Sequence, residues 1–378
     1  MAAIDLAQRR LLNKYQPDPE RSYNLPARYY TDPEIFEREK EAIFFKTWQF
    51  VGHAEDLPEP GCYITTKIFD QNVVIIRGKD GRLRAFYNVC SHRAHELLEG
   101  SGKEAKISCP YHGWTYELDG GLFSARGSEK VKGFEPSEFC LKSVRLEVFL
   151  NLIFVNLDPD APSLESQTGA LAEEIRDFVP DLDNLTKAHR CTFELEGNWK
   201  NVADNFLECY HCPIGHPAFA DMIDMASYRT KTYGIYSSHL SRSRTKHKGK
   251  AYDFDPSGES PVGCFWFLWP NLAINIFPGT SNIGVFQFIP AGPELTYETF
   301  DLYLRDKTPT PLEREMIDYF EQTLNPEDIS LVESVQRGLH SKGYHQGRYV
   351  VDAERTEVSE HALHHFHGLV LDALEGSA

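Results

Sequence analysis

The chain has 378 residues, of which 41% are hydrophobic and 25% are charged, which is ordinary for a globular protein with a sizeable core. At roughly 100–200 residues per domain, this length allows two domains. The formal net charge of −17 argues against nucleic acid and an anionic membrane as partners, because both require a basic protein surface.

Targeting and membrane-spanning patterns are not found in the sequence. Met1–Tyr15 lacks an apolar core of about 7–15 residues, and the apolar run Val148–Leu157 falls short of about 18 residues. We therefore expect a cytoplasmic protein without a membrane partner. Outside the metal motifs described below, the cysteines follow no disulfide spacing, and we expect reduced thiols at Cys62, Cys140, Cys191, Cys209, Cys212 and Cys264.

The first part of the chain is predicted to be rich in strands after one helix. An amphipathic helix is expected over Pro33–Trp48, with Pro33 at its first position. Strand-like segments follow and end at Asp158-Pro159-Asp160-Ala161-Pro162, a predicted domain boundary. The expected strands are Gly61–Ile68, Gln71–Arg77, Leu83–Asn88 and those within Val144–Leu157.

Two pairs of potential metal ligands fall at strand ends in this region. Cys90 and His92 form a C-x-H motif, and Cys109 and His112 form a C-x2-H motif. Two thiolates and two imidazoles suit a Rieske [2Fe-2S] cluster, which has a potential of roughly −150 to +300 mV, against about −400 mV for an all-Cys plant-type cluster. Such a centre transfers single electrons. A structural Cys2His2 zinc site is the alternative interpretation.

The remainder of the chain alternates helices with closely spaced strands. Short turns between the later strands, such as Pro278-Gly279, favour an antiparallel meander. The expected helices are Leu164–Phe178, Trp199–Tyr210, Pro311–Leu324, Asp328–Gly338 and Glu360–Leu374, and the expected strands are Thr192–Glu196, Gly263–Trp269, Asn271–Phe277, Ile283–Ile289 and Tyr297–Arg305. The order of elements predicts a β-domain over 45–158 and an α+β domain formed by 1–44 and 159–378.

A second metal site is predicted near the end of a helix. His211 and His216 are five residues apart, and Pro213 disfavours helical geometry at the residue before it. The helix should therefore end near His211, and a loop should carry His216 back toward it. With one carboxylate, two imidazoles form the facial triad of non-haem Fe(II) oxygenases, which leaves positions open for O₂.

The carboxylate has to come from another part of the chain. Glu327, Asp328 and Glu333 lie at the start of a predicted helix, and from chemistry alone each remains a candidate. We choose Asp328 because its short side chain holds geometry well, whereas Glu327 favours the helix dipole.

Two acids precede His211 on the predicted helix. Glu208 lies three residues before it on the same face, where its carboxylate could accept the second ring N–H of His211 and fix the tautomer. Asp204 lies one turn earlier and could serve as a further relay or as a structural acid.

With both metal motifs in this order, the chain resembles the oxygenase (α) subunits of Rieske non-haem iron oxygenases from Pro26-Ala27-Arg28-Tyr29-Tyr30 to the C-terminal helix. The resemblance implies a Rieske domain followed by a helix-grip catalytic domain. It also implies a homo-oligomer, a C3 trimer, in which the cluster of one subunit supplies electrons to the iron of its neighbour. Glu208 would link His211 to His112 of the partner subunit, and Asp328 would be the third iron ligand.

Within this family the chain is most similar to the quaternary ammonium branch, which comprises the carnitine, betaine and choline monooxygenases. The residues that carry this similarity are Leu207–Cys212, Pro326–Asp328, Leu331–Leu339, Ser359–His361 and His365–His367. The chain departs from the family pattern at Ser91 and Ala94, which replace Pro and Gly of the first cluster loop. Phe206 replaces a Tyr of the carnitine-type relatives, which puts carnitine itself in doubt.

The resemblance implies a two-component monooxygenase. The sequence lacks a G-x-G-x-x-G dinucleotide fingerprint after a strand, so electrons would come from NAD(P)H through a separate flavin and iron-sulfur reductase. With O₂, the enzyme would hydroxylate a small quaternary ammonium compound, giving N-demethylation or C–N cleavage. The alternative is an aromatic ring-hydroxylating dioxygenase, which releases a cis-diol, or an aromatic acid monooxygenase.

Three other patterns bear on the substrate and on the metal sites. Strand alternation in Cys264–Trp269 separates Trp266 from its neighbours, and we select Trp266 with Phe206 or Tyr210 as an aromatic cage for the ammonium group. A plain hydrophobic core is the alternative for these rings. Cys209-x-x-Cys212 is expected to be a packing feature of a helix rather than a redox pair. A solvated or interface helix face, rather than a metal site, is expected for His361, His364, His365 and His367.

Overall fold

The computed structural model describes residues 13–246 and 251–376, and the chain forms two compact units. The inserted unit is Lys40–Gln167, which extends slightly beyond the β-domain predicted over 45–158. The large unit joins the segment up to Glu39 with the segment from Thr168 onward. Most of Met1–Tyr15, where we expect no targeting signal, lies outside the described residues. No helix within the described ranges is long and apolar enough to cross a membrane.

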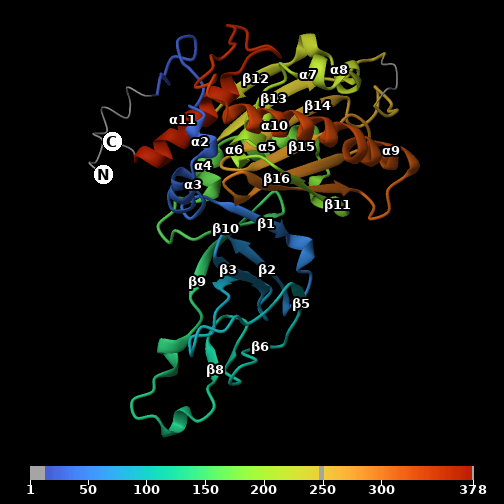
Figure 1. Cartoon of the computed structure of the whole chain (residues 1–378). Helices are drawn as coiled ribbons and strands as arrows, with labels where there is room; N and C mark the ends of the chain where they lie inside the picture. The colour runs from blue at the N-terminus through green and yellow to red at the C-terminus, as the bar shows by residue number, and fades with distance from the viewer. Residues whose placement is uncertain (1–12, 247–250, 377–378) are drawn as a thin grey trace. The chain divides into compact units, whose positions relative to one another are not determined.

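The inserted unit is built on a seven-stranded antiparallel sheet in the order β1-β10-β9-β4-β3-β2-β5, with a second sheet in the order β6-β7-β8 (Figure 1). Its strands are β1 (Gln49–His53), β2 (Cys62–Ile68), β3 (Gln71–Arg77), β4 (Leu83–Tyr87), β5 (Ser101–Lys103), β6 (Ile107–Ser108), β7 (Thr115–Tyr116), β8 (Leu122–Ser124), β9 (Ser143–Phe149) and β10 (Leu152–Asn156). The prediction for β3 is confirmed at both ends, because its run of Val and Ile is buried on both faces of the sheet. Between β9 and β10 the chain turns at Leu150 and Asn151, which both adopt positive φ.

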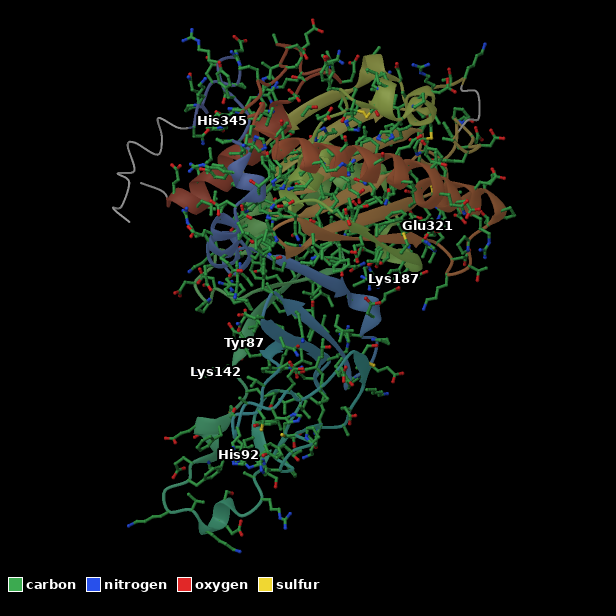
Figure 2. All side chains as sticks on the ribbon, viewed as in Figure 1. Tyr87, His92, Lys142, Lys187, Glu321 and His345 are labelled. Atoms are coloured by element: carbon green, nitrogen blue, oxygen red, sulfur yellow. A yellow bond between two sulfur atoms is a disulfide. The ribbon has the colours of Figure 1, made fainter. Side chains whose placement is uncertain are left out.

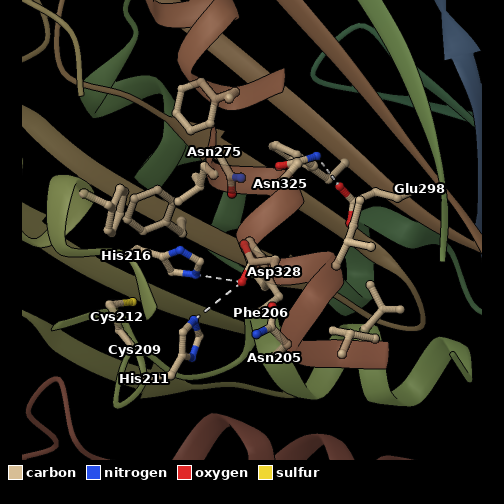
Figure 3. Close-up of a pocket in the computed structure, with 18 of the residues that line it drawn as sticks. Asn205, Phe206, Cys209, His211, Cys212, His216, Asn275, Glu298, Asn325 and Asp328 are labelled. Atoms are coloured by element: carbon tan, nitrogen blue, oxygen red, sulfur yellow. Dashed lines mark hydrogen bonds and ion pairs between the residues drawn. A yellow bond between two sulfur atoms is a disulfide. The ribbon is translucent and has the colours of Figure 1, made fainter. Parts of the chain in front are cut away.

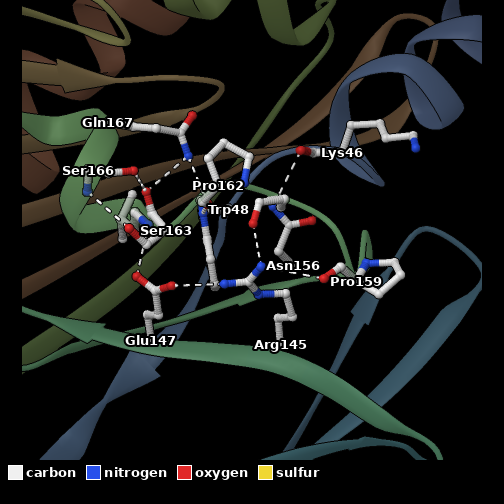
Figure 4. Close-up of polar contacts among 12 residues, drawn as sticks. Lys46, Trp48, Arg145, Glu147, Asn156, Pro159, Pro162, Ser163, Ser166 and Gln167 are labelled. Carbon is white, nitrogen blue, oxygen red and sulfur yellow. Dashed lines mark hydrogen bonds and ion pairs between the residues drawn. The ribbon is translucent and has the colours of Figure 1, made fainter.

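Polar contacts hold the end of the inserted unit against its own sheet (Figure 4). The indole N–H of Trp48 donates to the carbonyl of Pro162 at 3.0 Å, and the guanidinium of Arg145 donates to the carbonyl of Ala161. Glu147 accepts the backbone N–H of Leu164 at 2.8 Å. Because β1 also pairs with β10, the two ends of this unit lie on adjacent strands.

The large unit contains a second antiparallel sheet of seven strands, in the order β11-β17-β16-β15-β14-β13-β12. Its strands are β11 (Thr186–Leu195), β12 (Arg229–Thr232), β13 (Tyr236–Arg242), β14 (Val262–Leu268), β15 (Leu272–Ile276), β16 (Asn282–Gly292) and β17 (Leu295–Leu304). The predicted antiparallel meander is confirmed for β14 to β17, whereas β12 and β13 are not among the predicted strands. Together with the helices, these sheets confirm the α+β class.

Helices α6 and α10 contact strands of this sheet (Figure 1). The α-helices are α2 (Arg28–Thr31), α3 (Pro33–Glu39), α4 (Leu164–Thr168), α5 (Leu171–Phe178), α6 (Trp199–Phe206), α7 (Cys212–Gly215), α8 (Pro217–Met222), α9 (Pro311–Tyr319), α10 (Asn325–Leu339) and α11 (His361–Glu375). Short 3-10 or π-helical turns are η1 (Lys40–Phe44), η2 (Ala54–Asp56), η3 (Ser128–Lys130), η4 (Pro136–Phe139), η5 (Leu182–Asn184), η6 (Met225–Ser227) and η7 (Phe320–Leu324). The helix predicted over Leu164–Phe178 is interrupted at Gly169, which adopts a φ of 54°.

A buried ion pair connects the N-terminal segment of the large unit to α6. Nζ of Lys200 lies 2.6 Å from Oε1 of Glu39, and both side chains are fully buried. The indole N–H of Trp199 donates to the other oxygen of Glu39 at 2.8 Å. Burial lowers the pKa of Lys200, while the adjacent Glu39 opposes this shift.

The histidines of α11 correct a prediction. A solvated or interface helix face was expected, and the solvated alternative is wrong for His364 and His367, which are buried. Nε2 of His364 lies 2.8 Å from the carbonyl of Gln16, and Nδ1 of His367 lies 2.6 Å from the hydroxyl of Tyr349. Both side chains form hydrogen bonds inside the large unit, because the segments that contain Gln16 and Tyr349 cover α11.

Candidate metal sites and active-site cavity

The four cluster motif residues lie in loops of the inserted unit. Cys90 and His92 follow β4, Cys109 and His112 follow β6, and His92 projects from its loop (Figure 2). Both cysteines are buried. The ring centroids of His92 and His112 lie 4.6 Å apart, and His92 stacks on Trp114 with centroids 4.8 Å apart.

The two loops share one backbone arrangement. The N–H of Ala94 donates to the carbonyl of Cys90, and the N–H of Gly113 donates to the carbonyl of Cys109, each at 3.0 Å. Ala94 and Gly113 both adopt positive φ, of 55° and 76°. This conformation favours glycine, and it costs a residue with a Cβ roughly 1–2 kcal/mol. Ala94 therefore adopts this conformation at some cost in strain.

Polar atoms in these loops fit a bound [2Fe-2S] cluster. Nδ1 of His112 is buried and accepts or donates no hydrogen bond within the described part of the chain, as expected of a ligand atom. The hydroxyl of Tyr116 lies 3.3 Å from Sγ of Cys90 and accepts the N–H of Ser91 at 3.0 Å. Hydrogen bonds to cluster sulfurs are among the interactions that set the reduction potential.

The large unit brings together His211, His216 and Asp328. Their ligand atoms lie within 4.8 Å of one another, and Asp328 stands in the first turn of α10 (Figure 3). Oδ1 of Asp328 lies 2.8 Å from Nε2 of His216 and 3.7 Å from Nε2 of His211. Two imidazoles and one carboxylate are the donor set of a facial triad, so this group fits a mononuclear iron.

Each of these imidazoles contacts a second carboxylate through its other nitrogen. Oε1 of Glu208 lies 2.5 Å from Nδ1 of His211, and Oε2 of Glu327 lies 2.8 Å from Nδ1 of His216. Such contacts fix the tautomer that leaves Nε2 free to bind a metal. We missed this contact of Glu327, which we expected to favour the helix dipole. The adjacent acids Glu327 and Asp328 could have indicated this contact, since two neighbouring carboxylates can each contact one nitrogen of the same imidazole.

The pKa of His216 reflects the negative charge of this site. Burial alone would lower the pKa of its imidazole, but the carboxylates of Asp328 and Glu327 outweigh burial and raise it. A site that stabilises a cationic imidazole in this way also suits a metal cation.

The segment before His211 differs from the prediction. The helix α6 ends at Phe206 rather than near His211, so Glu208 lies in the loop after α6 and not on a helix face. Its Oε2 accepts the backbone N–H of His211 at 3.1 Å, a local bond that competes with helical pairing. Cys209 and Cys212 form a disulfide here, so the expectation of reduced thiols is wrong for this pair. The expectation is confirmed for Cys62, Cys140, Cys191 and Cys264.

Asp204 is held by groups from two other segments of the large unit. The hydroxyl of Tyr30 donates to its Oδ2 at 2.6 Å, and Nε2 of His367 lies 2.9 Å from its Oδ1. Asp204 and Glu208 also line a common cavity with His211. Asp204 is thus a member of a hydrogen-bond network beside His211.

A cavity of about 110 Å³ opens at the iron site. It is lined by His211, His216 and Asp328, by aromatic rings that include Phe206 and Phe265, and by side-chain amides. Tyr210 and Trp266, two of the predicted substrate-binding residues, are not brought to this cavity. Tyr210 is exposed, and the indole N–H of Trp266 donates to Glu174 of α5 at 2.9 Å. Strand alternation explains the correction, because Phe265 faces the cavity and its neighbour Trp266 therefore points to the opposite face of β14.

Sequence reasoning also missed Glu298 and Asn275, which line the cavity from β17 and β15 (Figure 3). Asn325 donates a side-chain N–H to Oε1 of Glu298 at 2.8 Å. Burial, and then the charge of Asp328, raises the pKa of Glu298 to about 8. Oδ1 of Asn275 is buried without a hydrogen-bond partner in the described structure. No motif surrounds either residue, so only the strand register could have indicated them.

Two family descriptions match the chain. Residues 47–135 match the Rieske [2Fe-2S] domain, and residues 182–376 match the ring hydroxylating alpha subunit (catalytic domain). The second match spans the metal residues of the large unit.

Known relatives cover nearly the whole chain. It is 38% identical over 355 residues to the carnitine monooxygenase oxygenase subunit of Escherichia coli (strain K12), spanning 93% of this chain and 94% of that protein. It is 32% identical over 384 residues to the chloroplastic choline monooxygenase of Beta vulgaris, spanning 97% and 81%. The solved structure of a quaternary ammonium Rieske monooxygenase matches with a TM-score of 0.88 and 37% identity, covering 95% of this chain and 98% of that one.

Proposed function

This chain belongs to the Rieske non-haem iron oxygenases, and from that membership we propose that it is the oxygenase component of a monooxygenase for small quaternary ammonium compounds. The observation that carries the proposal is the 38% identity over 93% of the chain to a carnitine monooxygenase oxygenase subunit. The aromatic cavity beside His211, His216 and Asp328 supports it, because aromatic rings attract quaternary ammonium groups.

The two metal groups have separate residues and separate tasks. Cys90, Cys109, His92 and His112 would hold the [2Fe-2S] cluster, and His211, His216 and Asp328 would hold the iron. When bound, the cluster supplies single electrons and the iron supplies O₂ activation. The protein keeps both imidazoles of the iron site oriented through Glu208 and Glu327.

Electrons would reach the iron site from another subunit of a C3 trimer. Glu208 would connect His211 to His112 of the partner subunit, and Asp204 would support this connection through its hydrogen-bond network. A reductase partner is implied by the oxygenase-subunit relatives, and we infer that it carries flavin and an iron-sulfur cluster and oxidises NAD(P)H. We place the protein in the cytoplasm, where NAD(P)H is available.

The product follows from the position of the new hydroxyl group. One oxygen atom of O₂ enters a C–H bond next to the nitrogen, and the other leaves as water, formed with two electrons from the reductase and two protons from solvent. The resulting hemiaminal breaks its C–N bond, and the carbon leaves as an aldehyde. The nitrogen keeps the electron pair of that bond and departs as a tertiary amine, and the hydroxyl proton is released to solvent.

The proposal is tested with the cluster- and iron-loaded protein and a compatible reductase. L-Carnitine, γ-butyrobetaine, glycine betaine, choline and simple aromatic acids are supplied in turn, and NADH use, aldehyde, amine and diol are measured. Aldehyde and amine release from a quaternary ammonium compound is the expected result. Consumption of aromatic acids alone, with diol release, would replace the proposal by the ring-hydroxylating alternative.

A further inference from the structure

We infer that Glu298 is the counter-charge for the substrate's ammonium group, and that the cavity selects quaternary ammonium alcohols without a carboxylate. This inference rests on the proposed function and narrows its substrate class. Carnitine and the betaines are zwitterions, whereas the class named here carries one positive charge and no negative one.

Glu298 reaches the cavity from the sheet. In the register of β16 and β17 it lies directly opposite Phe288, so the two side chains share one face. Both line the cavity, and Phe206 packs near Phe288 with ring centroids 6.0 Å apart. A cation beside Glu298 would therefore meet aromatic ring faces and one carboxylate, the two features that favour a positive charge without protons to donate.

The other acids of the cavity are already engaged. Asp328 and Glu208 contact the imidazoles of His216 and His211, whereas Glu298 receives one hydrogen bond from the amide of Asn325. Burial raises the pKa of Glu298, so an ionised carboxylate at this position is stabilised by a positive partner. A bound ammonium ion would supply that charge, and the pair would then be neutral within an apolar enclosure.

The described lining of the cavity offers no cationic side chain to a carboxylate on the substrate. Its described lining contains no Lys or Arg, and its acids would repel a second negative group. A substrate carboxylate would thus lose its hydration without gaining an ionic partner.

A hydroxyl group has a partner, by contrast. Oδ1 of Asn275 is buried, lines the cavity and lacks a hydrogen bond within the described residues. An unpaired buried acceptor is costly, and a ligand O–H that reaches it removes that cost. Charge and hydroxyl together describe an amino alcohol of the choline type.

The test compares ligands that differ in one feature. Isothermal titration of the cluster- and iron-loaded protein measures binding of choline, its uncharged isostere 3,3-dimethyl-1-butanol, ethyltrimethylammonium and L-carnitine. We expect choline to bind at least about tenfold more tightly than each of the other three. Tighter binding of L-carnitine than of choline would overturn the inference while leaving the proposed function intact. Turnover of aromatic acids alone would remove the proposed function itself.

Glu298→Gln separates charge from structure, because a glutamine oxygen still accepts the Asn325 hydrogen bond. The preference for choline over its uncharged isostere should fall to within about threefold, with unchanged iron content. Asn275→Ala should reduce only the preference for choline over ethyltrimethylammonium. Glu294→Gln, in the turn before β17, is the matched control and should retain both preferences. If Glu298→Gln keeps the charge preference, Glu298 has a purely structural role and the inference fails.

Discussion

Oε2 of Glu327 lies 2.8 Å from Nδ1 of His216, while the next residue along the chain, Asp328, contacts Nε2 of the same ring at 2.8 Å. Two consecutive acids at the start of α10 thus contact the two nitrogens of one imidazole. Asp328 is a candidate metal ligand, and Glu327 orients the imidazole of His216 beside it. Because α10 carries both, a shift of this helix would disturb ligand and orienting group together.

Glu327→Ala should weaken iron binding about 10–100-fold, because an unoriented His216 loses its preferred tautomer and position. Glu327→Gln should have a smaller effect, since its amide oxygen can still accept from Nδ1. Competition between the protein and a coloured Fe(II) chelator measures the affinity. Glu315→Ala, which removes an exposed acid of α9, is the control. Equal iron affinity in Glu327→Ala and the control would contradict the orienting role.

Glu208→Gln should retain both metals and lose electron delivery, because the amide no longer carries the charge or exchanges the proton of the carboxylate beside His211. Reductase-driven turnover should fall about 10–100-fold or more. Turnover with hydrogen peroxide, which bypasses the cluster, should be largely retained. Stopped-flow absorbance of the reduced cluster measures its reoxidation directly. Full reductase-coupled activity in this variant would exclude Glu208 as the connection.

Lys200→Met should lower the free energy of unfolding by about 3–5 kcal/mol, because it leaves Glu39 as an unpaired buried charge. The double variant Glu39→Gln/Lys200→Met should recover most of this loss, since the glutamine is neutral and still accepts the indole N–H of Trp199. Urea unfolding followed by near-UV circular dichroism provides the values. A double variant no more stable than Lys200→Met would show that the pair matters through packing rather than charge.

Stability should fall as pH rises from about 4.5 to 7. Burial, with the nearby Glu208 and Asp204, raises the pKa of Glu360 to about 7, so the folded protein holds a proton that the unfolded chain has already released. The unfolded state therefore binds fewer protons in this window, and the free energy of unfolding decreases by about 3 kcal/mol at most before levelling off. Glu298 acts in the same direction up to about pH 8.

Melting temperatures across this pH range test the assignment. Glu360→Gln should roughly halve the slope between about pH 4.5 and 7, because Glu298, whose pKa is about 8, contributes a comparable slope over the same range. A wild-type profile that rises with pH, or a Glu360→Gln profile that matches it, would contradict the buried neutral form of Glu360.

That the motif residues lie close together could be predicted, because each motif is short and local. Cys90 and His92 are two residues apart, and His211 and His216 are five apart, so chain geometry alone keeps each pair close. Asp328 follows more than a hundred residues later, and chemistry alone left it among three acids. The family resemblance selected it, and the structure then brought it to His216.

The cavity could not be predicted in the same way. Alternation correctly separates Phe265 from Trp266, but it does not tell which face of β14 meets the iron site. Glu298 depends on the pairing of β16 with β17, which is a matter of register rather than of motif. The end of α6 at Phe206 was not predicted, because the carboxylate of Glu208 accepts the backbone N–H of His211. Helix propensity does not include such a local contact.

The adjacency of β1 and β10 has a consequence for the order in which the protein is made. All of Lys40–Gln167 leaves the ribosome before most of the large unit, and its first and last strands pair with each other, so it can close into a finished module during translation. Glu39 lies just before this module, and its ion pair with Lys200 cannot form until Lys200 has been synthesised. The segment that ends at Glu39 therefore packs onto the large unit late in synthesis. The module Lys40–Gln167 is a natural unit for exchange between relatives.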